Sequence, residues 1–445
     1  MCARSNTGKI SEARGRKVQE GAPPARSAGG PSARAQASLR RAARGSSARE
    51  QASPRRAARD LPAADQAHSA QADPAIIVCG LSALRGIRRA RRVHDLWSWA
   101  PLDAQEQERV LAAATSCKSL IDFEELARHG FWGEEETEEL ELLVGRPADR
   151  RRVAHVRCRC ASGPLPEGSL CRVAPGLYAT SPLYAAWQYS KGRGIAAVVM
   201  LLSELMGTYG LSEEATMTIA WGGVWPGKEE GPAPAAPADA TDSDLAAPAA
   251  DDKPADQVHY RCDPAFTRED LDAFARISSG RVFAQAAAIA LPDAASPMES
   301  VMAGMLGAPH RLGGFGLSAL RGGMLLNHRI NFNYDAVLMS SGMPYAICDA
   351  YIPAAKAEIE YNGIGHEEES ARVHDGERNN GIRGMGIKVV VVNRGQMRDI
   401  QALEAIARSF HRAAGVRYRD VNDGQRVLQG AWLNSLRAAI GMDPV

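Results

Sequence analysis

The sequence lacks a long apolar run. None of its stretches reaches the ~20 apolar residues that a transmembrane helix needs, and the longest candidate, 195–202, is soon followed by Glu204. Its start also lacks the run of about 7 to 15 apolar residues found in a signal peptide. We therefore expect a cytoplasmic protein without a membrane partner, whose 8 cysteines stay reduced.

A large net charge is also absent, because 53 Lys+Arg nearly balance 52 Asp+Glu. The balance conceals an asymmetry: residues 1–74 hold 14 Lys+Arg and 6 Asp+Glu, a net charge of +8, and leave −7 for the rest. Residues 1–74 have few large apolar side chains, so they bury too little surface to offset the entropy of ordering. We predict a disordered basic tail. Such a tail can contact phosphate nonspecifically, although Arg-rich disordered termini are also common.

Cys158, Cys160 and Cys171 raise the question of a structural zinc site. Structural zinc prefers paired C-x2-4-C spacings and a fourth ligand, whereas this C-x-C pair has one further partner nearby. We interpret the three cysteines as small, half-buried strand residues.

The rest of the chain divides into four regions. Residues 75–150, including EEETEELELLVG, space apolar residues three and four apart and predict a helical, winged-helix-like module, although such helix pairs also arise by chance. Residues 151–290 predict a mixed α+β region with strands over 153–180, then helices, and an acidic disordered insertion at 228–257. Residues 291–420 predict an α/β domain, and 421–445 a C-terminal helical extension.

Residues 296–415 predict the element order α-β-β-α-β-α. Ser296 should cap the first helix, with Pro297 at its first position. PYAICDAYI and KAEIEYNG predict two adjoining strands, and EEESARVHDGERNNGIRGMG a charged helix. GIKVVVVN predicts a central strand buried on both faces, and RDIQALEAIARSFHRAAG an amphipathic closing helix.

The second strand carries a row of polar residues. Because side chains alternate along a strand, Lys356, Glu358, Glu360 and Asn362 should share one face, which is costly inside a domain unless something pairs with them. Asp349, near the end of the adjoining strand, should come within a few Å of Glu360. Two carboxylates so placed are usual oxygen ligands of Mg²⁺, which can activate a water for attack on a phosphodiester.

These residues carry a family resemblance. The motifs D-x-Y-x-P, I-E-Y-N-G-x-G-H, D-x-x-R and G-I-K-V-V-V-V resemble the nuclease-like domain of the DUF559 group, which is related to the very-short-patch repair endonucleases and the PD-(D/E)XK restriction-endonuclease-like fold. The resemblance covers 296–415. A fainter one over 76–295, through LSALRG, PLPEGSLCRVAPGLYATSP and LLSELMGTYG, is to AbiEi-like antitoxins and regulators.

The resemblance implies roles for particular residues. Asp349 and Glu360 would be ligands of Mg²⁺ or Mn²⁺, and Glu299 would support the site from the first helix. His366 would lie near the scissile phosphate, as ligand or proton donor. The simpler alternatives are that Asp349 caps a turn and that His366 is merely solvated.

The next helix would line the site with Asp375 and Arg378, although two such residues three apart also form exposed ion pairs. Asn362 departs from the family, which has an acid at a position where the wider fold usually has Lys. Glu358 could compensate as an alternative ligand, and Lys356 could supply the missing positive charge.

Two functions follow from these expectations. The first is a Mg²⁺-dependent DNA endonuclease in DNA repair or genome defence. The second is a non-catalytic, DNA-binding transcriptional regulator resembling AbiEi antitoxins, with a cognate toxin as partner. The joint presence of Asp349, Glu360, His366 and Glu299 favours the first function, whereas Asn362 and the acidic body favour the second.

Overall fold

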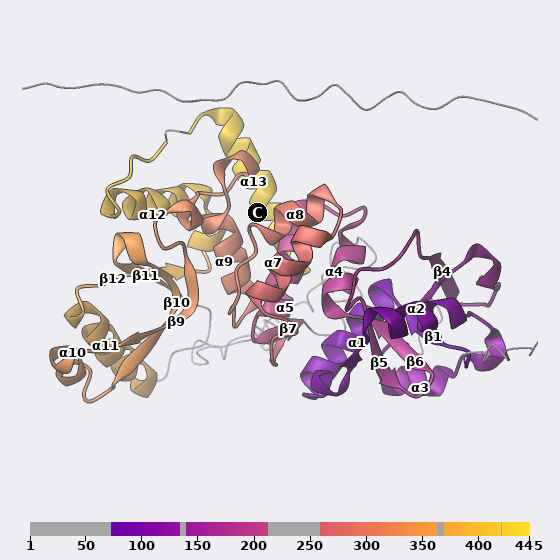
Figure 1. Ribbon diagram of the computed structural model, residues 1–445. Coiled ribbons are helices and arrows are strands. Elements are labelled where there is room, and N and C mark those ends of the chain that lie inside the picture. The colour runs from indigo at the N-terminus through magenta and orange to yellow at the C-terminus, as the bar shows by residue number, and fades with distance from the viewer. Residues whose placement is uncertain (1–72, 134–138, 212–258, 363–368, 420) are drawn as a thin grey trace, which may run out of the picture. The chain divides into compact units, whose positions relative to one another are not determined.

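The structure is a computed structural model that describes residues 73–133, 139–211, 259–362, 369–419 and 421–445 (Figure 1). The chain divides into two units, Met1–Ala67 and His68–Val445, and the second holds every described element. The predicted basic tail, except for Asp73 and Pro74, and the predicted insertion at 228–257 lie outside the described residues. Within the described ranges, no helix is both long and apolar enough to cross a membrane.

A six-stranded mixed sheet lies in the first part of this unit, in the order β2-β5-β6-β1-β3-β4. Helix α1 packs against β3, β6 and α4. The strands and helices of this part are β1 (Ile76–Val78), α1 (Gly80–Arg92), β2 (Ala100–Pro101), α2 (Ala104–Ala113), α3 (Phe123–Arg128), β3 (Leu140–Val144), β4 (Val156–Cys160), β5 (Leu170–Ala174), β6 (Leu177–Thr180) and α4 (Pro182–Ser190).

The prediction that residues 75–150 form a helical module is only partly right: α1, α2 and α3 are helices, but they accompany strands of the first sheet. β1 and β3 are strands, and β3, which the acidic segment suggested to be helical, is buried along its whole length. An interior strand needs apolar residues on both faces, and LELLV supplies them apart from Glu141. The Glu141 carboxylate accepts a hydrogen bond from Leu81 N at 2.7 Å and pairs with Arg159 at 2.5 Å. Since β4, β5 and β6 belong to the same sheet, no separate winged-helix-like module exists among the described residues of 75–150.

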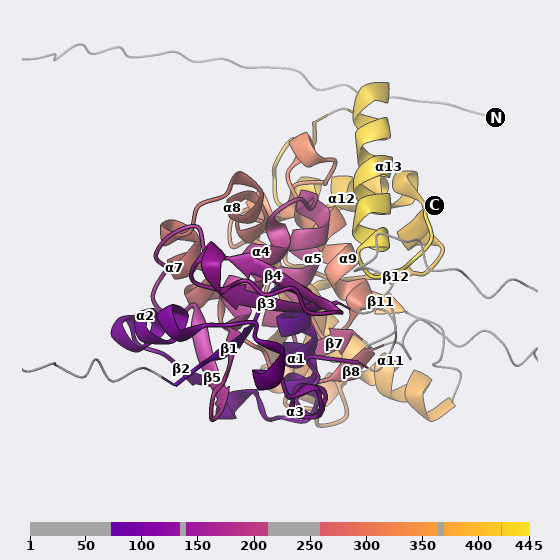
Figure 2. The same ribbon diagram turned by 90° about the vertical axis from the view of Figure 1, so that its right-hand side faces the viewer.

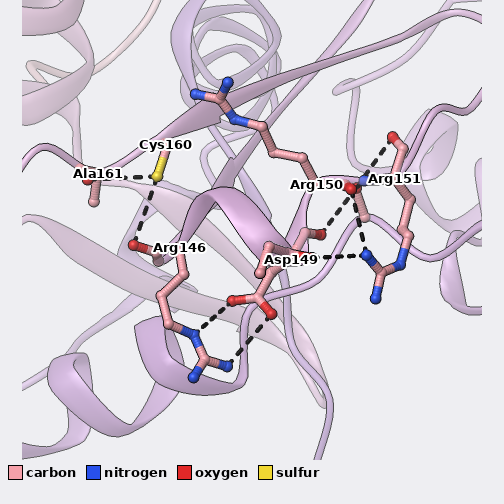
Figure 3. A network of polar contacts seen from close by, with 9 residues as sticks. Arg146, Asp149, Arg150, Arg151, Cys160 and Ala161 are labelled. Carbon is pink, nitrogen blue, oxygen red and sulfur yellow. Dashed lines mark hydrogen bonds and ion pairs between the residues drawn. The ribbon is translucent and has the colours of Figure 1, made fainter.

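The interpretation of the three cysteines as strand residues is confirmed. Cys158 and Cys160 lie on β4, and Cys171 lies on β5, with three strands between. At about 4.8 Å between neighbouring strands, this places Cys171 too far across the sheet to share a metal with the other two. Figure 3 shows Cys160 beside Ala161, next to the turn in which Arg146 pairs with Asp149 at 2.9 Å.

Helices form the middle of the chain, as predicted. They are α5 (Ile195–Met206), α7 (Arg268–Ile277) and α8 (Arg281–Ala287), with a two-stranded sheet of β7 (Tyr209–Leu211) and β8 (His259–Arg261). Arginines of α1 tie the first sheet to this part. Arg88 pairs with the buried Glu204 of α5 at 2.5 Å, and Arg91 donates to the carbonyl oxygens of Glu204 and Gly207, which end that helix, at 3.0 and 2.9 Å.

A four-stranded mixed sheet in the order β12-β11-β10-β9 forms the last part. Neighbouring strands are antiparallel, except that β12 runs parallel to β11. Helices α9 and α11 both pack on β10, and α13 packs along α5 and α9 (Figure 2). The elements are α9 (Pro297–Gly307), β9 (Leu325–Asn331), α10 (Tyr334–Met339), β10 (Tyr345–Ile352), β11 (Ala357–Asn362), α11 (Glu369–Gly384), β12 (Lys388–Asn393), α12 (Ile400–Ala413) and α13 (Asp423–Ala438).

Most of the predicted order in 296–415 is confirmed. Ser296 caps α9, with its hydroxyl accepting from Glu299 N at 3.2 Å. The prediction omitted β9 and α10, which lie between α9 and β10. It was also wrong about β12, which is an edge strand: Val391 in its middle is 49% exposed. An apolar run alone therefore did not show whether the strand had a neighbour on both sides.

Candidate active site

Asp349 lies half-buried on β10, next to Glu360 of β11. The register brings the two together, because Ala350 pairs with Ile359 and the next pair along the antiparallel ladder would be Asp349 with Glu360. The Oδ2 atom of Asp349 accepts a hydrogen bond from Tyr361 N at 2.7 Å. Its Oδ1 atom has no hydrogen-bond donor among the described residues. One carboxylate oxygen is therefore fixed by the fold, and the other is free to take a ligand.

Glu358 and Glu360 both face α11, because both contact Arg378 of that helix. The Arg378 Nη2 atom lies 2.8 Å from Glu360 Oε2 and 3.5 Å from Glu358 Oε2. Glu358 is fully buried, and its Oε1 atom has no hydrogen-bond partner in the described part of the chain. The side chain of Glu360 is 30% exposed, so it alone of the two can be reached from solvent.

Arg378 spans the two strands. Besides the glutamates of β11, its Nη2 atom donates to the carbonyl oxygen of Ile347 on β10 at 2.5 Å. Its side chain is only 14% exposed. The alternative of an ion pair with Asp375 concerns a side chain that lies outside the described residues. The structure places the arginine in the carboxylate cluster.

The carboxyl groups of the cluster resist ionisation. Burial, and then the charge of Asp349, raise the pKa of Glu360 to about 8, against the opposing charge of Arg378. Burial also raises the pKa of Asp349 and of Glu358. The charge of the single arginine therefore does not offset the burial and mutual repulsion of three carboxylates, and a further cation among them would stabilise their ionised forms.

Glu299 approaches the cluster from α9. It is 8% exposed, and its Oε2 atom accepts from Ala295 N at 2.9 Å and from Asn327 Nδ2 at 2.6 Å. Burial raises the pKa of Glu299 to about 7, and the nearby charge of Asp349 contributes to the rise. Glu299 therefore lies near Asp349, and the Oε2 atom of Glu299 is already occupied by two donors of the protein.

Three further predicted site residues remain, and one of them, Lys356, is placed differently from the prediction. Lys356 precedes β11 in a left-handed turn with φ 43° and is exposed; the prediction that it shares the strand face of Glu358 is wrong, because the strand begins one residue later. Asn362 is the exposed last residue of β11 and pairs with Asn393. His366 lies outside the described residues.

Two participants were missed from the sequence. Asn327 fixes Glu299, and its φ of 45° marks an irregularity inside β9. Cys348 is fully buried, and burial together with the charge of Glu358 raises the pKa of its thiol. Recognising β9 would have indicated Asn327. The neighbourhood of Cys348 and Glu358 depends on strand register, which no local motif specifies.

The carboxylates of Asp349 and Glu360 fit a hard divalent cation through the oxygens that the protein leaves unengaged. Within the described ranges, no three His, Cys, Asp or Glu side chains form a group that could hold a metal ion. Mg²⁺, however, is commonly held by only one or two carboxylates and keeps several waters. Asp349 and Glu360 each have one oxygen engaged by the protein and one without a protein partner among the described residues. They are the residues that would hold such an ion.

Comparison with known proteins gave no match: no family model, no curated protein and no solved structure matches the chain.

Proposed function

We propose that the protein is a DNA endonuclease that uses Mg²⁺ or Mn²⁺ to hydrolyse phosphodiester bonds, in DNA repair or genome defence. The observation that carries the proposal is the pair of Asp349 and Glu360 on adjoining strands. Each carboxylate is held through one oxygen, by Tyr361 N and by Arg378 respectively, and each leaves its other oxygen available. Such a pair suits shared coordination of one hard cation.

The order of elements supports the same class. α9, the antiparallel strands β9 to β11 with α10 between the first two, the connecting helix α11 and the parallel strand β12 are compatible with the restriction-endonuclease-like core that the resemblance implies. The acidic pair lies on the second and third strands of that plan. This agreement of order and site adds to the proposal more than either alone, since a fold by itself does not specify an activity.

Each residue then has a distinct task. When bound, the metal would supply a water of lowered pKa and stabilise charge on the phosphate. Arg378, which already spans Ile347 O and Glu360, can donate to a non-bridging phosphate oxygen, for which a guanidinium is well shaped. The buried Glu358 keeps Arg378 in place. Glu299 adds negative charge near Asp349 and so favours cation binding.

The proposal is tested by incubating the full chain with supercoiled plasmid and with single-stranded DNA, in Mg²⁺, Mn²⁺ or EDTA. We expect metal-dependent nicking that Asp349→Asn and Glu360→Gln each reduce by at least about 100-fold, while Asp335→Asn, an exposed acid of α10, retains wild-type activity. Cutting that persists in EDTA, or that both site variants leave unchanged, would refute the metal-dependent nuclease.

One observation favours a second function. Arg378 places a positive charge against Glu360 and Glu358, as a resident counter-ion would in a domain that no longer binds metal, and Asn362 provides no charge at the end of β11. We therefore retain the non-catalytic DNA-binding regulator, with a cognate toxin as partner, as the alternative. Sequence-selective, salt-sensitive binding to the promoter of its own gene, without cleavage in Mn²⁺, would favour that alternative.

A further inference from the structure

A rigid turn after β12 presents two arginines to solvent. Asn393 and Gln396 exchange hydrogen bonds, with Asn393 N donating to Gln396 Oε1 at 3.0 Å and Gln396 N donating to Asn393 Oδ1 at 2.9 Å. Met397 is fully buried and anchors the turn in the core. Arg394 and Arg398 flank these anchors, and both are exposed. Their backbone positions are therefore fixed although their side chains face solvent.

Neither of these arginines is neutralised locally. In the described part of the chain, the guanidinium groups of Arg394 and Arg398 have no carboxylate within ion-pair distance and no hydrogen-bond acceptor. The neighbouring acid, Asp399, is engaged elsewhere: its Oδ1 atom accepts from Gln401 N at 2.8 Å and from Ala402 N at 3.2 Å, at the start of α12. The nearest acid in sequence thus caps a helix and is not paired with either guanidinium.

A third arginine, Arg437 in the last turn of α13, is buried. Arg437 is 3% exposed, and its Nε atom donates to the carbonyl oxygen of Asp443 at 2.8 Å. Burial, followed by the charges of Arg398 and Arg394, lowers the pKa of Arg437, which the carboxylate of Asp443 only partly opposes. Arg437 is therefore too buried to contact a ligand, and its positive charge only adds to the potential around the two exposed arginines.

The two exposed arginines form an arginine patch (Arg394 and Arg398) that follows β12 and adjoins the carboxylate cluster. In the parallel ladder of β11 and β12, Glu360 pairs with Val391 and Asn362 pairs with Asn393. Arg394 thus lies three residues beyond the partner of Glu360, about 10 Å along the strand at roughly 3.3 Å per residue.

We propose that the exposed Arg394 and Arg398 bind the phosphate backbone of a nucleic acid and hold it near Asp349 and Glu360. The placement beside the reacting group rests on the proposed nuclease function, whereas the recognition of phosphate rests on the patch itself. Guanidinium groups bind phosphate oxygens through two parallel hydrogen bonds. Contacts of this kind position a strand without reading its sequence. The patch accordingly selects for a polyanion and not for a base sequence.

The test is the salt dependence of DNA binding, measured by fluorescence anisotropy with a labelled 20-base-pair duplex in EDTA, so that cleavage does not contribute. Each phosphate contact contributes about 0.9 to the slope of log K against log salt concentration for duplex DNA. The double variant Arg394→Gln/Arg398→Gln should therefore lower the magnitude of the slope by about 1.8. The matched control, Arg276→Gln/Arg281→Gln, removes the same charge from exposed arginines of α7 and α8 and should leave the slope unchanged.

Two results would overturn the proposal: an unchanged slope in the patch variant, or an equal decrease in the patch and control variants. Arg437→Lys, which keeps the buried charge, should bind as the wild type does within about twofold, and a loss as large as that of the double variant would count against charge as the cause.

Failure of the proposed nuclease activity is distinguished from failure of the patch. If the wild type does not cut DNA in Mn²⁺ but the slope decreases as expected, the patch stands without the activity; if it cuts and the slope is unchanged, only the patch is refuted.

Discussion

Replacing Glu299 by Gln should make the stability of the metal-free protein less dependent on pH. The Glu299 side chain is 8% exposed, and burial raises the pKa of its carboxyl from 4.5 to about 7. One pKa unit corresponds to about 1.4 kcal/mol, so ionising this carboxyl costs the folded state about 3 kcal/mol. The pKa of Glu299 is higher in the folded state than in the unfolded state. The protonated carboxyl therefore stabilises the folded protein fully below pH 4.5, and this contribution to the free energy of unfolding is lost as the pH rises through 7.

Glutamine cannot ionise, and its amide oxygen can still accept from Ala295 N and Asn327 Nδ2, as Glu299 Oε2 does. We expect Glu299→Gln to match the wild type at about pH 4.5 within ~1 kcal/mol and to exceed it by about 3 kcal/mol at pH 8, in urea unfolding with EDTA. Glu108→Gln, at an exposed position on α2, serves as the control. Parallel stability curves for wild type and Glu299→Gln across this range would refute the assigned environment of Glu299.

Two further predictions concern buried polar contacts. Arg378→Met leaves Glu358 and Glu360 without their counter-ion, and loss of one partner of a buried pair costs about 3 to 5 kcal/mol. Urea unfolding at pH 8 should show this loss in EDTA and a partial recovery in Mn²⁺. Equal stability of variant and wild type would contradict the pairing. Gly80→Ala should lower the free energy of unfolding by about 2 kcal/mol or more, because Gly80 has φ +59° and an added Cβ would lie 1.7 Å from Glu141 Oε2. Denaturation curves of variant and wild type that coincide would contradict this conformation.

The sequence allowed prediction of the elements whose signals are local. The cap at Ser296, the helices of 182–206 and 268–287, and the strands around Asp349 and Glu360 were expected from side-chain type and spacing, and the structure has them. Capping, helical periodicity and strand alternation are set by neighbours in the chain. They can therefore be read without knowledge of the tertiary fold.

The missed or mistaken elements depend on tertiary context. β3 carries acidic residues on its N-terminal side and was expected to be a helix, but its place inside a sheet made it a strand. β12 is as apolar as an interior strand and nevertheless lies at an edge. Lys356 was assigned to β11 by alternation, although the strand begins only after the turn that contains it. Strand neighbours and exact boundaries are not encoded in a short window of sequence.

The candidate site was predictable only where local sequence signals specify it. Sequence pattern indicated that Asp349 and Glu360 would lie together, and register places them next to each other. It left open whether Arg378 pairs with Asp375 or lines the site, and the structure places its guanidinium between Glu358, Glu360 and Ile347 O. The link from Asn327 to Glu299 joins positions 28 residues apart, a distance at which no periodicity gives guidance.

The central claim is that Asp349 and Glu360 share one divalent cation. Its most direct test is titration of the full chain with Mn²⁺, with free Mn²⁺ followed by electron paramagnetic resonance and with Mg²⁺ as competitor. We predict one Mn²⁺ ion per wild-type chain, displaced by Mg²⁺, and loss of this ion in Asp349→Asn and in Glu360→Gln but not in Asp335→Asn. Binding that is unchanged in both site variants, or absent from the wild type, would contradict the claim.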